Sequence, residues 1–132
     1  MAIPESGLLV FDGECGFCTR ALGWFRLLDR EARVTSLPLQ GPGVPERVGA
    51  TPERCKEVLH FTADGRVTTG AAAINAALSV ALRRDLPQTV YARTAGVQER
   101  VYTWVAAHRG RLPGMTPWCT RYPDSCGACT AA

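Results

Sequence analysis

The sequence predicts an α/β fold, in which short strands alternate with helices. Three patterns point to it: an apolar run at Leu8–Phe11 that ends in an Asp-Gly turn, an amphipathic segment directly after it, and a hairpin that leads into an alanine-rich helix. The chain has 132 residues, of which 46% are hydrophobic and 20% are charged. This length is enough to bury a core as one domain, and the composition is ordinary for a soluble globular protein.

The first part of the chain holds two predicted strands with a helix between them. Leu8–Phe11 is short, apolar and followed by a turn, which is typical of a buried strand. Apolar residues then recur at helical spacing between residues 17 and 30, and we expect Trp24 and Phe25 on that face to lie in the core. Residues 33–39 form the second predicted strand, and the proline near its end indicates that pairing stops or lies at an edge there.

The remaining elements follow in order along the chain. Residues 40–55 are rich in proline and glycine and are expected to be mostly loop, with a short helical turn near 52–55. Residues 56–69 alternate as a hairpin does, with Asp64-Gly65 as its turn, and an alanine-rich helix over 70–84 follows. A last helix is predicted over 97–108, between two glycines.

Strand, helix, strand, loop or short helix, hairpin and helix is the element order of a thioredoxin-like fold. We therefore predict a thioredoxin-like domain with a C-terminal helical extension over residues 1–112. Residues 113–132 show no periodicity and are predicted to be an irregular, cysteine-containing tail. We expect little of the core to depend on this tail, so truncation after Gly114 should leave the protein folded. Such folds usually place a cis-proline just before the third strand, and the nearest candidate, Pro52, lies several residues too early.

Cys15 and Cys18 form a C-x-x-C pair where the first strand turns into the first helix. Unpaired N–H groups and the partial positive charge of a helix N-terminus stabilise a thiolate over a thiol. We expect this position to lower the pKa of Cys15 from about 8.5 into the range of about 3.5–7.5. Cys15 is then the attacking sulfur, and Cys18, deeper in the first turn, resolves the mixed disulfide.

Two other functions are consistent with the cysteines. A zinc-binding module would use the Cys15/Cys18 and Cys126/Cys129 pairs, although a pair that opens an amphipathic helix, over a hundred residues from its partner pair, fits a zinc site poorly. The third possibility is a structural domain that keeps a degenerate redox fold for partner binding. The redox pair is the function we favour.

Three segments resemble the thiol–disulfide oxidoreductase DCC family. "FDGECGFCTR" is similar to the family's D-x-x-C-x-x-C signature, met by Asp12, Cys15 and Cys18, and "DGRVTTGAAAI" is similar to a second conserved region. "VYTWVAAHRGRL" resembles its Y-x-x-V-A-x-x-R segment, matched at Tyr102, Val105, Ala106 and Arg109. The resemblance implies a thioredoxin-like fold and dithiol–disulfide exchange with substrates that are mostly unassigned.

Asp12 is the third candidate site residue, with two possible roles. Its side chain could accept or relay the proton that Cys18 loses, or it could cap the turn into the helix, which is a common role of Asp before Gly. Arg20 could help to hold a thiolate, but a solvated helix charge is the more common role. We expect the lone His60 to be no metal ligand and Cys55 to be a small buried residue.

Three cysteines lie in the tail: Cys119, Cys126 and Cys129. They could form a second dithiol that passes electrons to Cys15–Cys18, bind zinc with His108 as a fourth ligand, or oxidise as an exposed segment. The sequence leaves these three open.

Composition also bears on location and partners. The net charge of +3 is too mild, and the arginines too scattered, to indicate nucleic-acid binding. The start of the chain lacks a basic and apolar signal peptide, and no stretch approaches the roughly 20 apolar residues of a membrane span. We therefore expect a cytoplasmic protein without a cofactor, whose partners are a protein or small-molecule disulfide or dithiol and an external reductant.

Overall fold

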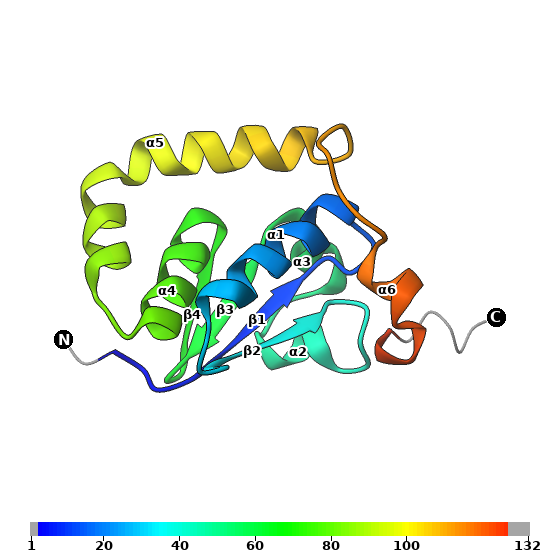
Figure 1. Ribbon diagram of the computed structural model, residues 1–132, viewed down its shortest axis with the longest axis horizontal. Helices are drawn as coiled ribbons and strands as arrows, with labels where there is room; N and C mark the ends of the chain where they lie inside the picture. The colour runs from blue at the N-terminus through cyan, green and yellow to red at the C-terminus, as the bar shows by residue number, and fades with distance from the viewer. Residues whose placement is uncertain (1–2, 127–132) are drawn as a thin grey trace.

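A computed structural model of the chain describes residues 3–126 and confirms the mixed α/β fold, which is consistent with a thioredoxin-like fold. Its four-stranded sheet has the order β2-β1-β3-β4 (Figure 1). β1 (Gly7–Phe11) pairs in parallel with β2 (Val34–Pro38) and antiparallel with β3 (His60–Ala63), which in turn pairs antiparallel with β4 (Arg66–Thr69).

β1 is the centre of the molecule because both of its faces are buried. Its side chains alternate, so Leu9 and Phe11 join one core cluster and Leu8 and Val10 join another. The first cluster lies against α1 (Gly16–Leu28) and α4 (Gly70–Leu82). The second lies against the short helices α2 (Val44–Arg47) and α3 (Pro52–Glu57). Burial on both faces explains why this strand is continuously apolar in sequence.

The predicted hairpin between β3 and β4 is confirmed. Asp64 and Gly65 both have positive φ, 51° and 76°, as the tightest hairpin turns require. Gly70, which opens α4 directly after the hairpin, also has a positive φ of 63°.

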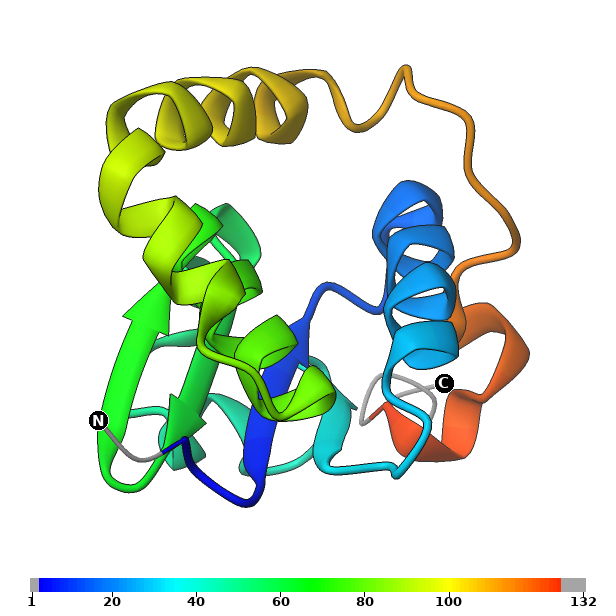
Figure 2. The same ribbon diagram turned by 60° about the vertical axis from the view of Figure 1, so that its left-hand side comes forward.

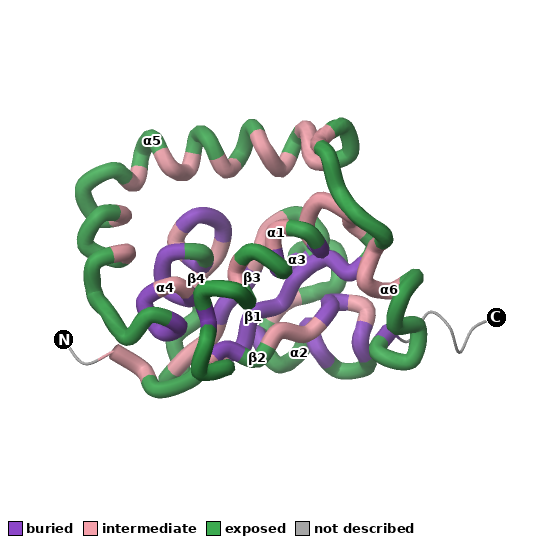
Figure 3. Tube along the Cα trace, in the orientation of Figure 1, coloured by how far each residue is buried: buried purple, intermediate pink, exposed green. Residues whose placement is uncertain are grey.

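α5 (Leu86–His108) is longer than the helix predicted over 97–108. Its first half escaped prediction because two segments meet at Thr94, whose φ of −126° and ψ of 20° are not helical, so the apolar periodicity is interrupted there. The second half of α5 runs across the top of the molecule above α1 and α4, and its first half descends beside α4 (Figures 1 and 2). None of its residues is fully buried, in contrast to β1 and α4 (Figure 3).

Polar contacts hold α5 in this position. The Glu99 carboxylate accepts hydrogen bonds from the backbone N–H groups of Ala71 and Ala72, at 3.2 and 3.3 Å, in the first turn of α4. A carboxylate is favourable at a helix N-terminus because it meets unpaired donors and the positive end of the dipole. The Tyr102 hydroxyl accepts a hydrogen bond of 2.8 Å from the Leu59 N–H next to β3.

The segment after Pro113, expected to be irregular, contains α6 (Trp118–Arg121) and a 3-10 turn (Pro123–Ser125). The expectation that the core depends little on it was wrong. Trp118 packs edge-to-face on Phe11 with ring centroids 5.6 Å apart, and Cys126 is only 1% exposed. A four-residue helix is too short to reveal itself by apolar periodicity.

The expectation for Trp24 was also wrong, since it is 52% exposed, whereas Phe25 packs against the core as predicted. Successive helix positions point about 100° apart, so only one of two adjacent residues faces the core directly. Trp24 instead lies beside Phe17 and beneath the guanidinium of Arg20. Pro52 is the first residue of α3, so it does not lie just before β3, as the sequence already indicated.

No helix among residues 3–126 is both long enough and apolar enough to cross a bilayer.

Candidate active site

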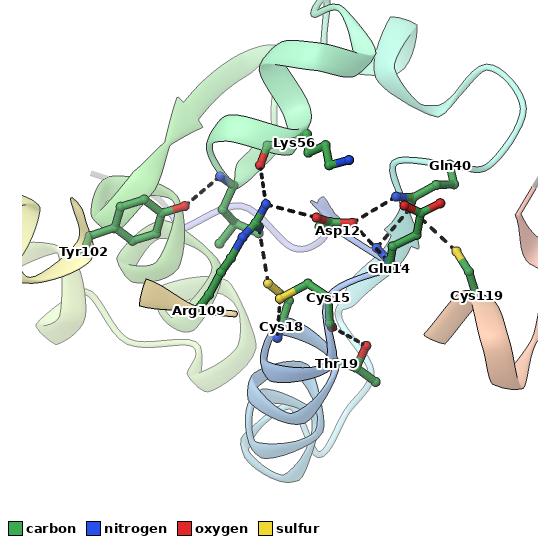
Figure 4. Close-up of polar contacts among 12 residues, drawn as sticks. Asp12, Glu14, Cys15, Cys18, Thr19, Gln40, Lys56, Tyr102, Arg109 and Cys119 are labelled. Atoms are coloured by element: carbon green, nitrogen blue, oxygen red, sulfur yellow. Dashed lines mark hydrogen bonds and ion pairs between the residues drawn. The ribbon is translucent and has the colours of Figure 1, made fainter. Parts of the chain in front are cut away.

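Cys15 lies at the N-cap of α1, where the chain turns from β1 into the helix (Figure 4). Its Sγ accepts a hydrogen bond of 3.1 Å from the Cys18 backbone N–H, in the position that a Ser or Asp oxygen occupies in ordinary helix caps. The backbone carbonyl of Cys15 accepts a hydrogen bond of 2.9 Å from the Thr19 hydroxyl. The sulfur is therefore held against the unpaired N–H groups of the first turn.

The two thiols have opposite pKa shifts. The pKa of Cys15 is lowered to about 6, first because the Cys18 side chain hydrogen-bonds to its sulfur, and further by the Cys18 N–H and the charge of Arg109, while burial and Asp12 oppose the change. The pKa of Cys18 is strongly raised, because its proton is engaged by Cys15 and because the group is buried. At neutral pH the pair holds one thiolate, on Cys15, and one thiol, on Cys18.

Arg109, just after the end of α5, reaches back to this pair. Its Nη1 lies 3.6 Å from the Cys18 Sγ, and its Nη2 lies 3.1 Å from the Asp12 Oδ2 and donates to the Lys56 carbonyl at 3.0 Å. One guanidinium thus joins the buried thiol to the buried carboxylate (Figure 4).

Asp12 is 5% exposed and uses both of its oxygens. Oδ1 accepts hydrogen bonds from the Glu14 N–H at 3.0 Å and the Gln40 side-chain amide at 2.9 Å, and Oδ2 pairs with Arg109. The Glu14 contact is the turn-capping bond expected of Asp before Gly. The carboxylate also fixes the position of Arg109.

A disulfide between Cys119 and Cys126 lies behind the active-site loop. The Cys119 N–H donates to the Gly13 carbonyl at 2.8 Å, and a Cβ added to Gly13 would lie only 2.6 Å from the Cys119 Sγ. The same sulfur lies 3.7 Å from the Gln40 Oε1, a van der Waals contact because a disulfide sulfur has no proton to donate. The loop that carries Asp12 is therefore packed against the tail.

The zinc site expected as an alternative gains no support from residues 3–126, which contain no cluster of three or more potential ligands. Cys126 is bonded to Cys119, and Cys129 lies outside the described residues. His108, the fourth ligand considered, stacks on Trp104 and hydrogen-bonds to the Trp104 carbonyl at 2.7 Å.

The other residues that the sequence analysis considered, Cys55, His60 and Arg20, have structural roles. Cys55 is buried as predicted, and burial raises its pKa, so it is a poor nucleophile. His60 is buried in β3 with its Nδ1 2.9 Å from the Val58 carbonyl. Arg20 lies over the Trp24 ring.

A family model described as DCC1-like thiol-disulfide oxidoreductase matches residues 9–115 of the chain. The chain belongs to this family. Comparisons with curated proteins and with solved structures gave no match. The resemblance seen in the sequence is thus confirmed, and membership in the DCC1-like family identifies the protein as a thiol-disulfide oxidoreductase.

In this DCC1-like protein, sequence reasoning did not give Arg109 or Gln40 a role at the site. Arg109 was matched to the family's third segment, but no contact with the cysteines was predicted for it. It lies 91 residues from Cys18 in sequence, so only the course of α5 brings the two together. One indication of its role was present in the sequence, because the Y-x-x-V-A-x-x-R pattern of the third family segment ends on this arginine.

Proposed function

We propose that the protein exchanges its Cys15/Cys18 dithiol with a disulfide in a protein or a small molecule. The lowered pKa of Cys15 carries this proposal, because it gives a thiolate near neutral pH at the helix N-terminus. The Cys15 thiolate attacks one sulfur of the substrate, a mixed disulfide forms, and the other substrate sulfur leaves as a thiolate that takes a proton from water.

Cys18 completes the exchange in our proposal. Its raised pKa keeps it protonated until the mixed disulfide has replaced the Cys15 thiolate, whose hydrogen bond and negative charge hold that pKa up. Cys18 then loses its proton to water and attacks the Cys15 sulfur, which forms the intramolecular disulfide and releases the second substrate sulfur as a thiolate that takes a proton from water. The Arg109 guanidinium, 3.6 Å from the Cys18 Sγ, stabilises the negative charge that develops in this step.

We assign Asp12 to positioning rather than to proton transfer. Both of its oxygens are already engaged, one by Arg109 and the other by Glu14 and Gln40. Its contribution is to hold Arg109 against Cys18 and to fix the turn before Cys15.

A complete catalytic cycle also needs a second redox partner. An external thiol reductant returns the protein disulfide to the dithiol. In the opposite direction the protein disulfide oxidises a substrate dithiol, since the same geometry serves both directions. We place the protein in the cytoplasm, where free thiols persist.

Trapping tests the assignment of the two cysteines. Cys18→Ser should accumulate mixed disulfides through Cys15, because the resolving sulfur is gone, and Cys15→Ser should accumulate none. Cys55→Ser, which changes a buried thiol with a raised pKa, is the matched control and should behave as the parent protein does. Peptide mapping that finds the trapped adducts on Cys18 would overturn the proposal.

A further inference from the structure

An apolar cavity of about 490 Å³ lies beneath α5 and next to the dithiol. Its walls come from β1, α1, α4 and α5, and include Phe11, Phe17, Phe25, Ile74, Val97 and Val101. Cys18, Asp12 and Arg109 also line it. The cavity therefore joins an apolar space to the reacting sulfurs.

The cavity stays open because α5 is attached at separate polar points rather than packed onto α1. Glu99 and Tyr102 fix one part of the helix to α4 and to the start of β3, and Arg109 fixes its end to Asp12 and Lys56. Between these points Val97 and Val101 line the cavity, yet they are 65% and 57% exposed. Apolar side chains exposed inside a concave site favour a ligand that removes them from water.

The size of the cavity selects a small molecule as its occupant. One turn of a helix about 10 Å across fills roughly 420 Å³, so a partner helix could place only about one turn inside. A volume near 490 Å³ lies within the range of small-molecule sites.

The cavity connects to the nucleophile. A second hollow contains Cys15, Gly16 and Met115 among its lining residues, and it shares Asp12, Phe17, Lys56 and Arg109 with the apolar cavity. At this junction Asp12 pairs with Arg109, and Lys56 is the remaining charged residue that the two hollows share, so nothing there selects a cationic ligand. A ligand with its body in the cavity would present its end to Cys15.

We propose that this cavity binds the apolar body of a small disulfide, whose sulfur at the junction is the one that Cys15 attacks. This inference rests on the proposed function and names its substrate class. The Cys15 thiolate forms a bond with the near sulfur of R–S–S–R, the S–S bond breaks, and one R–S⁻ leaves and is protonated by water. Cys18 then displaces the second R–S⁻, so the substrate is reduced to two thiols and the protein is oxidised to its disulfide.

A series of dialkyl disulfides tests the cavity directly. We would react full-length Cys18→Ser protein with diethyl, dipropyl and dibutyl disulfide and follow adduct formation on Cys15 by mass spectrometry. Burial of each added methylene contributes up to about 0.8 kcal/mol, so the rate constant should rise by up to about fourfold per methylene of the bound chain. The same disulfides with mercaptoethanol give the reference slope in water.

Variants on α5 locate the effect. Val101→Glu puts a charge into the cavity and should abolish the dependence on chain length, and Val101→Thr, which keeps shape without charge, should weaken it. Val90→Glu is the matched control, because Val90 is a 45% exposed valine on the same helix that does not line the cavity, and it should keep the full dependence. The iodoacetamide reactivity of Cys15, measured in each variant, separates a change at the sulfur from a change in the cavity, and it should stay within about twofold in Val90→Glu.

The outcomes separate this inference from the proposed function. Adducts that form at rates no more dependent on chain length than the mercaptoethanol reference would overturn the cavity proposal and leave the exchange reaction standing. Loss of the dependence in Val90→Glu as well as in Val101→Glu would also overturn it. Slow alkylation of Cys15 together with no adduct from any disulfide would overturn the proposed function itself.

Discussion

At the scale of single residues, the reactivity of the site comes from the asymmetry between two sulfurs one helical turn apart. Cys15 accepts hydrogen bonds from the side chain and the backbone N–H of Cys18, and the same contact raises the pKa of Cys18. The thiolate therefore depends on its partner cysteine first and on the positive charge of Arg109 second.

Removal of the Cys18 thiol should raise the pKa of Cys15. Cys18→Ala deletes the largest cause of the low value of about 6 but keeps the backbone N–H, so we expect the midpoint of the alkylation rate against pH to rise by about one unit or more. Cys18→Ser, whose hydroxyl still donates to the sulfur, should shift the midpoint less. Equal midpoints in the two variants would show that the helix end alone makes the thiolate.

Loss of the Arg109 charge should affect the second step more than the first. Hydrogen bonds to charged groups contribute about 1.5–3 kcal/mol, and each 1.36 kcal/mol is tenfold in rate, so Arg109→Gln should slow resolution of the mixed disulfide by about tenfold or more. It should also raise the alkylation midpoint of Cys15 modestly, because its charge is a smaller cause of the low pKa.

Arg111→Gln removes an exposed charge two residues away and serves as the control, with both quantities unchanged. Stopped-flow release of the second substrate thiol measures resolution. An unchanged release rate in Arg109→Gln would remove Arg109 from the mechanism.

At the scale of elements, local patterns in the sequence predicted the helices and strands well, whereas contacts between distant segments were not predicted. The hairpin followed from Asp64-Gly65, and β1 followed from an unbroken apolar run, because both signals lie within a few residues. Trp24 was wrongly assigned to the core, and no core position was predicted for Trp118. Trp24 shares a helix with core residues but points outward, and Trp118 lies in an aperiodic segment whose packing on Phe11 is set by distant chain.

The role of α6 in the core gives a stability prediction. The Trp118 side chain packs on Phe11. Its backbone N–H donates to the Thr19 hydroxyl, which in turn donates to the Cys15 carbonyl. Full Trp→Ala truncations in cores cost about 3–5 kcal/mol, and Trp118 is partly exposed, so Trp118→Ala should lower the free energy of unfolding by about 2–3 kcal/mol in urea titration.

Trp24→Ala is the matched control on the exposed side of α1 and should cost less than about 1 kcal/mol. The same reasoning replaces the expectation that the tail can be removed without consequence: truncation after Gly114 deletes Trp118 and the Cys119–Cys126 disulfide together. A truncated protein as stable as the full chain would contradict the packing of α6 on the core.

At the scale of the whole molecule, the candidate site assembles from three distant parts of the chain. The β1–α1 turn supplies the cysteines and Asp12, and the first residue after α5 is Arg109 (Figure 4). Cys119 of the tail disulfide packs against Gly13. Sequence reasoning found the first part, because its spacing is local. It missed the other two and the cavity, because these depend on contacts between segments that lie far apart in the chain.

This assembly predicts how the stability of the reduced protein depends on pH. The pKa of Cys15 is about 6 when folded and about 8.5 when unfolded, so between these values the unfolded state binds more protons and stability rises with pH. The contribution is complete above about pH 8.5 and is lost as pH falls to about 6. Cys18 acts oppositely: its raised pKa keeps the folded state protonated where the unfolded thiol ionises, so stability falls above about pH 8.5.

We therefore expect the free energy of unfolding of the reduced protein, relative to reduced Cys15→Ser, to climb from pH 6 to about pH 8.5. The carboxylates and histidines common to both proteins cancel in this difference, which leaves the Cys15 thiolate below about pH 8.5 and adds the opposing effect of Cys18 above it. Urea titrations at pH 6, 7, 8 and 9 in the same reductant measure it. A difference that is flat across this range would mean that the folded protein does not stabilise the Cys15 thiolate, and the attacking sulfur would then have to be activated by the substrate instead.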